Sequence, residues 1–488
     1  MSMVVQHNMQ AANANRMLGI TSGAQAKSTE KLSSGYKINR AADDAAGLTI
    51  SEKMRKQIRG LDKASSNAQD GVSSVQTAEG ALTEVHSMLQ RMNELAVQAA
   101  NGTNSKDTDR KAIQDEIDQL NTEIDRVAET TKFNEIYLLK GDDGEKTVNM
   151  KAHDAGLKGT LTDNGDGTAT FKMDTLNAGD TVSIGGKNYT IGGEAADVTD
   201  MLTKAGITDA AGDKVTINGK EYTYCENASD GKTALIHKGY YETAPDTANA
   251  ATANPAYADS AAIAAAKSAT ISVGTKSITT IDDTKADGID DNDTSVITKQ
   301  KAYELAGKEL LAANQIGDTE GNAEVKNGDK SDLAYDAGNG TFNIKVGQAK
   351  VANTLSFSLH VGADADMTNK ITVDIDTMNS TNLGIKGLNV TDKNGTAATY
   401  AIDAISDAIS KVSSQRSALG AVQNRLEHTI DNLDNISENT SSAESRIRDT
   451  DMAKEMVNYS KNNILAQAGQ SMLAQANQSN QGVLSLLQ

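Results

Sequence analysis

Histidine and cysteine are the residue types most able to bind transition metals or act as nucleophiles, and both are sparse in this sequence. A zinc peptidase would place two histidines on one helix in a His-Glu-x-x-His string. No histidine here has another histidine three or four residues away, and the six stand singly at His7, His86, His153, His237, His360 and His428. We therefore predict no metal site, no cofactor and no catalytic residues.

A run of carboxylates in the second half of the chain is the densest group of possible calcium ligands. It comprises Asp290, Asp291 and Asp293, with Asp282 and Asp283 shortly before it. A calcium loop of the EF-hand type needs a glycine at its sharp turn and a closing glutamate that binds through both oxygens. Neither stands at that spacing, so we expect a solvated acidic loop rather than a calcium site.

Glycine pairs and the lone cysteine add no chemistry of their own. Gly185-Gly186 and Gly192-Gly193 lack the Lys-Ser or Lys-Thr of a phosphate-binding loop and fit hairpin turns better. The single cysteine, Cys225, excludes an internal disulfide, and we expect it to be a small buried residue. The sequence therefore favours a protein that is not an enzyme.

The bulk composition limits the partners. The chain has 488 residues and a net charge of -19, with a pI near 4.8. Nucleic acids and anionic membrane surfaces are bound by basic faces, so we expect neither as a partner. The sequence has no apolar stretch of 18 residues, so we predict no membrane span. The first 20 residues lack the basic start and apolar run of a cleavable signal.

Both ends of the chain carry the spacing of long helices that pack on other helices. Apolar residues recur at alternating steps of three and four from Val75 to Ala99, and the pattern extends upstream to Leu48. This predicts one helix of about 80 Å at 1.5 Å per residue. After a turn at 101–105, a second apolar strip runs from Ile113 to Val127, and we expect it to fold back antiparallel on the first.

A third strip near the C-terminus completes a predicted bundle. It runs from Ile402 to Leu433, and Arg416 and Gln423 fill its polar gaps. One strip alone cannot bury its apolar face, so we expect the three to share a core. The outermost segments, 1–34 and 452–488, are weaker strips rich in Gln, Asn and Ala, which would gain stability mainly by packing on copies of themselves.

The middle of the chain differs in composition and pattern. Residues 141–400 contain no arginine and hold 38 Asp and Glu against 23 Lys, which is most of the net charge. Period-two alternation with Gly-rich turns, as in residues 181–191, predicts short strands. Residues 178–190 recur as 211–223, which suggests duplicated hairpins. An Ala-rich run from Ala248 to Ala266 predicts a loop leading into a short helix.

Short motifs stand out at both ends of the chain. Near the N-terminus they are Lys31-Leu32-Ser33-Ser34-Gly35, residues 40–48 from Arg40 to Leu48, and Glu94-Leu95-Ala96-Val97-Gln98. Near the C-terminus they are residues 419–425, residues 473–478 and Val483-Leu484-Ser485-Leu486-Leu487. Together these motifs resemble bacterial flagellin, and the similarity covers about 1–140 and 400–488 in the order and at the distances from each end that the family shows.

The resemblance implies an α+β, multidomain architecture for a polymerising subunit. Long N- and C-terminal helices would form a coiled-coil bundle, with a β-rich variable region inserted between them. Residues 1–46 with 452–488 would form the inner tube of a filament, 47–140 with 401–451 the surrounding wall, and 141–400 the exposed surface. The resemblance further implies extracellular location in the bacterial flagellum, a motility role and type III export.

Partners and site residues follow from the same resemblance. The chain would polymerise with itself through Leu473, Val483, Leu484, Leu486 and Leu487, and would meet an export chaperone and the filament cap and junction proteins. A surface for the host Toll-like receptor 5 would centre on Arg91, Leu95 and Glu116. Met92-Asn93 stands where strong agonists have Val-Arg, so one basic contact is missing.

Two other interpretations remain open from the sequence. The first is a hook-filament junction protein, which shares helical ends of this type. The second is a filament protein whose middle region, 141–400, acts as an adhesin. Abundance in sheared flagella separates the first from a main subunit, and a glycan-binding assay on the middle region tests the second.

Overall fold

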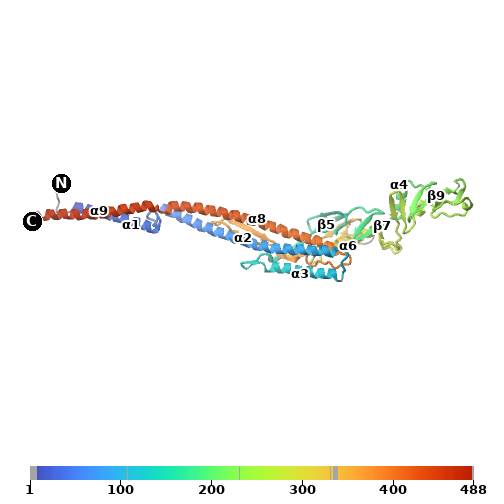
Figure 1. Cartoon of the computed structure of the whole chain (residues 1–488), viewed down its shortest axis with the longest axis horizontal. Helices are drawn as coiled ribbons and strands as arrows, with labels where there is room; N and C mark the ends of the chain where they lie inside the picture. The colour runs from blue at the N-terminus through green and yellow to red at the C-terminus, as the bar shows by residue number, and fades with distance from the viewer. Residues whose placement is uncertain (1–7, 107, 230, 330, 334–338, 486–488) are drawn as a thin grey trace. The chain divides into compact units, whose positions relative to one another are not determined.

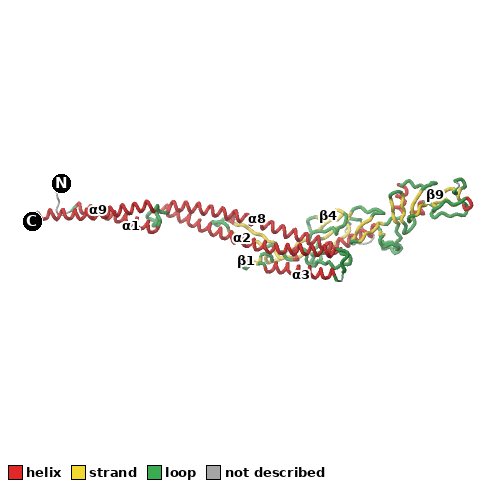
Figure 2. The backbone as a smooth tube through the Cα atoms, viewed as in Figure 1, coloured by secondary structure: helices red, strands yellow, loops and turns green. Residues whose placement is uncertain are grey.

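The computed structural model describes residues 8–106, 108–229, 231–329, 331–333 and 339–485 (Figure 1). The chain divides into two compact units. Unit 1 comprises Met1–Val75, Phe357–Val373 and Gly420–Gln488, and unit 2 comprises Gln76–Ser356 and Asp374–Leu419. Long helices occupy both ends of the chain and strands its middle (Figure 2), which confirms the predicted fold class.

Unit 1 is built on two pairs of helices and one hairpin. Helices α1 (Met9–Ser34) and α9 (Met452–Ser485) lie side by side. The N-terminal part of α2 (Ala45–Ala100) packs on the C-terminal part of α8 (Thr396–Arg448). The hairpin of β17 (Leu355–His360) and β18 (Lys370–Ile375) covers this second pair, with the short 3-10 turn η2 (Met367–Asn369) at its end.

Two small apolar cores hold the hairpin on the helices. One contains Ala68, Val361, Ile371 and Leu426, and the other contains Leu61, Ala64 and Leu433. A glycine at position 71 of α2 lets the hairpin approach closely, since a Cβ there would lie 2.2 Å from Leu359 Cδ1. The hairpin thus takes the place of a third helix against this part of α2 and α8.

A glycine and a capping aspartate mark the break between α1 and α2. Gly35 adopts a left-handed conformation with φ 75°, which few other residues tolerate, and ends α1. Asp44 accepts a hydrogen bond from Gly47 N at 2.9 Å and so caps the start of α2. A matching break separates α8 from α9, and the two breaks are joined by backbone hydrogen bonds, Lys37 N to Arg448 O and Thr450 N to Gly35 O.

The helical part of unit 2 contains the strongest predicted strip. All the strip residues on α2 are 0% exposed: Val75, the last residue of this part of unit 1, and Ala78, Leu82, Val85, Leu89, Met92, Ala96 and Ala99 in unit 2. Helix α3 (Asp109–Thr130) folds back antiparallel and buries Ile113, Ile117 and Ile124. The first part of α8 buries Ile405, Val412 and Leu419. The predicted three-helix core is therefore confirmed within this unit.

Strands from distant parts of the chain pair in the middle region. After the small hairpin β1 (Lys132–Phe133) and β2 (Ile136–Tyr137), β3 (Asp142–Asn149) pairs with β16 (Gln348–Asn353). A four-stranded sheet has the order β14 (Glu324–Asn327), β15 (Thr341–Lys345), β5 (Thr168–Met173) and β4 (Gly159–Asp163). Helix α6 (Lys299–Asn314) packs on this sheet.

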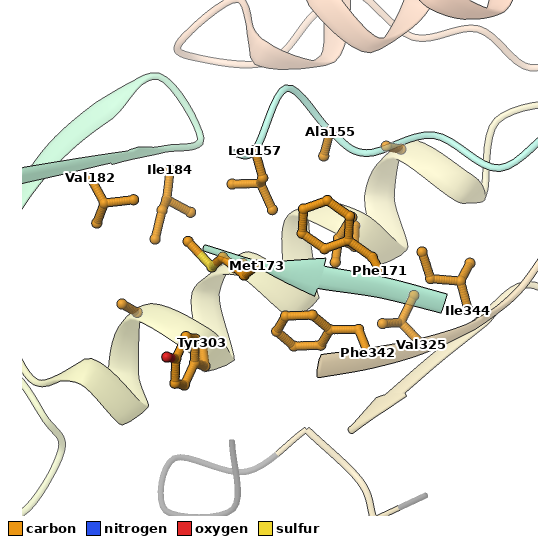
Figure 3. Close-up of a cluster of buried hydrophobic side chains, with 14 of the residues drawn as sticks. Ala155, Leu157, Phe171, Met173, Val182, Ile184, Tyr303, Val325, Phe342 and Ile344 are labelled. Carbon is orange, nitrogen blue, oxygen red and sulfur yellow. The ribbon is translucent and has the colours of Figure 1, made fainter. Parts of the chain in front are cut away.

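Figure 3 shows the apolar core between the four-stranded sheet and α6. Phe171 and Phe342 stack with ring centroids 6.4 Å apart, and Tyr303 of α6 lies in the same cluster. Val182 and Ile184 of β6 (Thr181–Ile184) also belong to it. Strand β6 pairs with β7 (Lys187–Ile191), which pairs in turn with β13 (Val296–Ile297).

A further sheet with its own core lies between β7 and β13 in the sequence. Its order is β10 (Ala234–Tyr241), β9 (Lys220–Asn227), β8 (Lys214–Ile217), β11 (Thr270–Val273) and β12 (Lys276–Thr279). Helices α4 (Ala195–Lys204) and α5 (Ser260–Ala264) cover it. The Ala-rich run forms the 3-10 turn η1 (Thr247–Asn249), a loop and α5, as predicted.

The predicted hairpin repeat is confirmed, and the structure adds a third copy. The turn of β6–β7 is Gly185-Gly186, and the turn of β8–β9 is Asn218-Gly219. Residues at equivalent positions of the two repeats pair across the strands in both hairpins. The hairpin β11–β12 has that register again, from Thr270 with Thr279 to Val273 with Lys276. Its turn, Gly274-Thr275, and Ile278 in place of tyrosine conceal the similarity in the sequence.

Candidate assembly and recognition surfaces

The pair of terminal helices has almost no core of its own. Within α1, all of which the structure describes, Ser28 is the single buried residue. Between 452 and 479, the part of α9 whose side chains the structure describes, no residue is buried. Two helices that meet along one narrow line cannot enclose apolar side chains, so those side chains stay in solvent.

Large apolar side chains are therefore exposed on both terminal helices. Isolated surface apolar residues are common, but many large ones on the same two helices indicate a surface that binds a partner. The set on α1 is Met9, Met17 and Ile20, and the set on α9 is Met452, Met456, Val457, Ile464, Leu465 and Met472, with exposures between 47% and 72%.

A groove runs where α1 and α9 meet. The helices are antiparallel, because Asn8 Nδ2 donates to Ala476 O at 3.1 Å and Gln25 Nε2 contacts Asn463 Oδ1 at 3.4 Å. The groove measures about 730 Å³ and is lined by small and apolar side chains with a few amides between them. Its lining includes Ala14, Leu18, Ala468, Gly469 and Met472.

The five residues predicted for polymerisation fall on α9 or beyond it. Leu473 is half-buried on α9. Val483 and Leu484 lie within the last turns of α9, and nothing is described of their side chains; Leu486 and Leu487 lie outside the described residues. Met9, Met456 and Val457 are also exposed, and they are not among the residues that the sequence predicts for these helices.

Of the three residues predicted for receptor binding, the structure brings two together on the surface. Arg91 on α2 contacts Glu116 on α3 through Nε and Nη2, both at 2.9 Å from Oε1, and Glu94 through Nη1 at 3.1 Å. The hydrogen bonds to Glu116 and then to Glu94 raise the pKa of Arg91, which is charged at any ordinary pH. The side chains of Arg91 and Glu116 are 49% and 44% exposed.

Leu95 differs from the other two. It stands one turn after Arg91 on α2, but it is 2% exposed and lies in the bundle core. Its position on the helix, directly before the core residue Ala96, explains the burial. The exposed surface at this site is therefore a charged pair, with Leu95 packed beneath it.

The acidic run forms a compact loop around one buried carboxylate. Asp290 is 2% exposed and accepts hydrogen bonds from Ser268 Oγ and from the backbone N–H groups of Asp282, Asn292 and Asp293. Burial opposes its charge, but these donors outweigh burial and lower its pKa. The expected solvated loop is thus wrong for Asp290, whose oxygens are used internally.

The other chemical groups remain apart. Among the described residues, no three His, Cys, Asp or Glu side chains converge as metal ligands. Burial raises the pKa of the Cys225 thiol, which is half-buried rather than fully buried as expected. No helix in the described part of the chain has the length and apolar character needed to cross a membrane.

Comparison with known proteins gives matches at both ends and over the whole length. A family model described as the bacterial flagellin N-terminal helical region matches residues 5–143, and one described as the C-terminal helical region matches 402–487. A flagellin of Clostridium tyrobutyricum is 38% identical over 494 residues, covering 98% of this chain and 100% of the relative.

A second relative supports the same family, whereas a match to a solved structure carries no argument about the fold. A flagellin of Bacillus subtilis (strain 168) is 34% identical over 488 residues, covering 99% of this chain and 100% of the relative. A solved structure, "3D structure of FliC from Burkholderia pseudomallei", aligns with 73% of this chain and 99% of that one at 16% identity. Its TM-score of 0.26 is too low to show a shared arrangement.

Proposed function

The chain belongs to the bacterial flagellin family and is a structural subunit of the flagellar filament, and we propose that its α1–α9 pair is the element that polymerises. The observation that carries this proposal is the lack of buried apolar residues in the described part of that pair, 9–34 and 452–479. Large apolar side chains are exposed on both helices, and α1 buries only Ser28 among residues 9–34. In a homopolymer, these side chains would be buried against the α1–α9 pairs of neighbouring subunits.

The contact is heterologous and does not close. In a filament, one face of each subunit meets a different face of the next, so addition continues without limit. Each large apolar side chain that passes from water into such a contact contributes about 1.5 to 3 kcal/mol. The exposed set on α1 and α9 is large enough to hold a polymer although the isolated pair is weakly packed.

Loss of apolar groups from the C-terminal residues tests this proposal. We expect the double substitution Leu484→Ala and Leu487→Ala to leave a folded monomer that forms no filaments, because two anchors of the contact are removed. Circular dichroism checks the fold, and negative-stain microscopy after seeding checks assembly. Normal filaments from this variant would remove the assembly role of the tail.

A three-layer division of the subunit completes the proposal. Residues 1–46 with 452–488 form the tube, 47–140 with 401–451 the wall, and 141–400 the outer surface. The helix breaks at Gly35–Asp44 and at Asp449–Asp451 support a boundary between tube and wall. The acidic composition of the middle region supports its contact with solvent.

The exposed face of α9 also suits partners that act before assembly. An unassembled subunit must keep its apolar helix away from other copies, and a chaperone that covers α9 would do so. Cap and junction proteins would meet the same helices at the filament ends. Support for these partners comes from the exposed Met456, Val457 and Ile464 and from membership of the family.

Receptor binding is a second function that one observation favours. Arg91 and Glu116 come from different helices and form an accessible charged pair, which fits recognition by Toll-like receptor 5. Arginine at the centre of an interface frequently dominates its affinity. The absent basic residue after Arg91 reduces the number of charged contacts that this surface can make.

Substitution of Arg91 with a matched control tests the receptor proposal. We expect Arg91→Ala to weaken binding to the receptor ectodomain about tenfold or more, because a charged anchor is lost. The control is Arg126→Ala, which removes another exposed arginine, 60% against 49% for Arg91, paired with Glu123 on α3. Surface plasmon resonance measures both. Equal affinities for the two variants would count against the proposed surface.

A further inference from the structure

One segment of unit 2 has neither the spacing of a helix nor that of a strand, yet it is held at many points. Residues 380–395, here called the strap, link β18 to α8 and include the short helix α7 (Ser380–Leu383). Four apolar side chains anchor the strap in the unit, each at most 3% exposed: Leu383, Ile385, Leu388 and Val390.

Helix α3 binds the strap through a row of polar side chains. This row, here called the polar seam, consists of Arg110, Gln114, Asn121 and Asp125, which lie within about 60° of one another on a helix of 3.6 residues per turn. The apolar strip of Ile113, Ile117 and Ile124 lies on the neighbouring face. Helix α3 therefore has two contact faces, one apolar and one polar.

The polar seam binds mainly the backbone of the strap, together with the hydroxyl of Ser380. Gln114 donates to Leu388 O at 2.8 Å and accepts from Val390 N at 2.8 Å, as a neighbouring strand would. Asn121 Nδ2 donates to Ile385 O at 3.3 Å. Asp125 accepts from Ser380 N at 2.7 Å and from its hydroxyl at 2.9 Å.

Arg110 fixes the end of the strap. It is 1% exposed, and its guanidinium donates to Asp392 O at 2.9 Å and Lys393 O at 3.0 Å. It also donates to Ala99 O and Asn101 O at the end of α2, where helix carbonyls lack partners. A buried arginine thus joins the last turn of α2, the first turn of α3 and the strap.

We propose that the strap is a latch for α3, closed by the polar seam, and that α3 separates from the bundle as a unit when these hydrogen bonds open. The strap lies 255 to 283 residues after its partners on α3. In a chain that is made from its N-terminus, α3 therefore stays unlatched until nearly the whole middle region exists. Closure of the latch also keeps Glu116 beside Arg91.

Limited trypsin digestion of the full chain tests the latch, because the strap carries two exposed lysines, Lys386 and Lys393. Cleavage in a held segment requires local opening, so its rate reports the open population. We expect Gln114→Ala to speed cleavage after Lys386 about tenfold, because two hydrogen bonds to the strap are lost. Mass spectrometry identifies each cut.

The matched control is Gln119→Ala. Gln119 is exposed on the opposite face of α3, and the same substitution there changes helix propensity equally without touching the strap. We expect it to be cleaved at the parent rate. Equal rates for the two variants would overturn the latch, and so would equal acceleration at Lys204 and Lys238 of the middle region, since that indicates general unfolding.

A milder variant keeps the test decisive if Gln114→Ala does not fold. Gln114→Glu retains the acceptor for Val390 N but cannot donate to Leu388 O. We expect an intermediate cleavage rate, with faster hydrogen exchange confined to α3 and the strap. Exchange that stays at the parent rate in both elements would overturn the proposal.

Discussion

At the scale of single residues, Leu95 is a buried side chain that packs directly beneath a charged surface. The helix places Leu95 one turn after Arg91, and the seam next to it turns its side chain into the core, where it is 2% exposed. Arg91 and Glu116 remain outside and pair with each other. An effect of Leu95 on recognition must therefore pass through the shape of the bundle.

Substitution of Leu95 by alanine should lower the free energy of unfolding. Removal of a buried leucine leaves a cavity and costs about 2 to 5 kcal/mol. Val97→Ala on the same helix, where the side chain is 53% exposed, should cost under about 1 kcal/mol. Urea denaturation followed by circular dichroism at 222 nm measures both. Similar costs for the two variants would contradict the burial of Leu95.

The sequence was informative about single residues where type and spacing determine the environment. The heptad positions from Val75 to Ala99 were predicted as core, and all are 0% exposed. Asp290 was predicted as solvated, because a carboxylate gives no sign in the sequence of the backbone donors that a folded loop directs at it. The burial of Arg110 was likewise not predicted, because the backbone carbonyls that bind its guanidinium cannot be recognised in the sequence.

At the scale of elements, the long helices were predictable and the connections between them were not. Helices α2, α3 and α8 follow from a sustained apolar period, and Gly35 and Asp44 mark the break before α2. The strap has no period, and its partners on α3 are polar residues that look solvent-exposed in the sequence. Pairings such as β3 with β16 link segments about 200 residues apart and leave no local signal.

Two glycines of α2 should respond with opposite sign to alanine. At Gly80 nothing lies within 4 Å of an added Cβ, so Gly80→Ala should stabilise by about 0.5 to 1 kcal/mol through helix propensity. At Gly71 the Cβ would lie 2.2 Å from Leu359 Cδ1 and 3.3 Å from Leu426 Cδ1, and overpacking costs about 1 to 3 kcal/mol. Thermal unfolding compares them, and a stabilised Gly71→Ala would show that β17 does not pack on α2.

At the scale of the whole molecule, charge and apolar surface are divided between different parts of the chain. The middle region carries most of the net charge of -19, and the terminal helices carry the exposed apolar side chains. Acidic repulsion between middle regions favours solubility, while apolar contact between terminal helices would favour addition of subunits. In the proposed assembly, the charged middle region stays in solvent and the terminal helices polymerise.

Assembly of two matched double variants tests whether polymerisation depends on the exposed apolar side chains of α1 and α9. The test variant is Ile464→Gln with Met472→Gln, residues 66% and 62% exposed on α9. The control is Ile236→Gln with Met367→Gln, residues 68% and 72% exposed on β10 and in the β17–β18 turn. Both change the same residue types at similar exposure.

The measurement is the critical concentration for filament growth from parent seeds, determined by sedimentation. We expect a critical concentration at least about a hundredfold higher for the α9 variant, since two apolar anchors are lost, and the parent value for the control. A parent value for the α9 variant, or equal loss of assembly in both, would contradict this expectation.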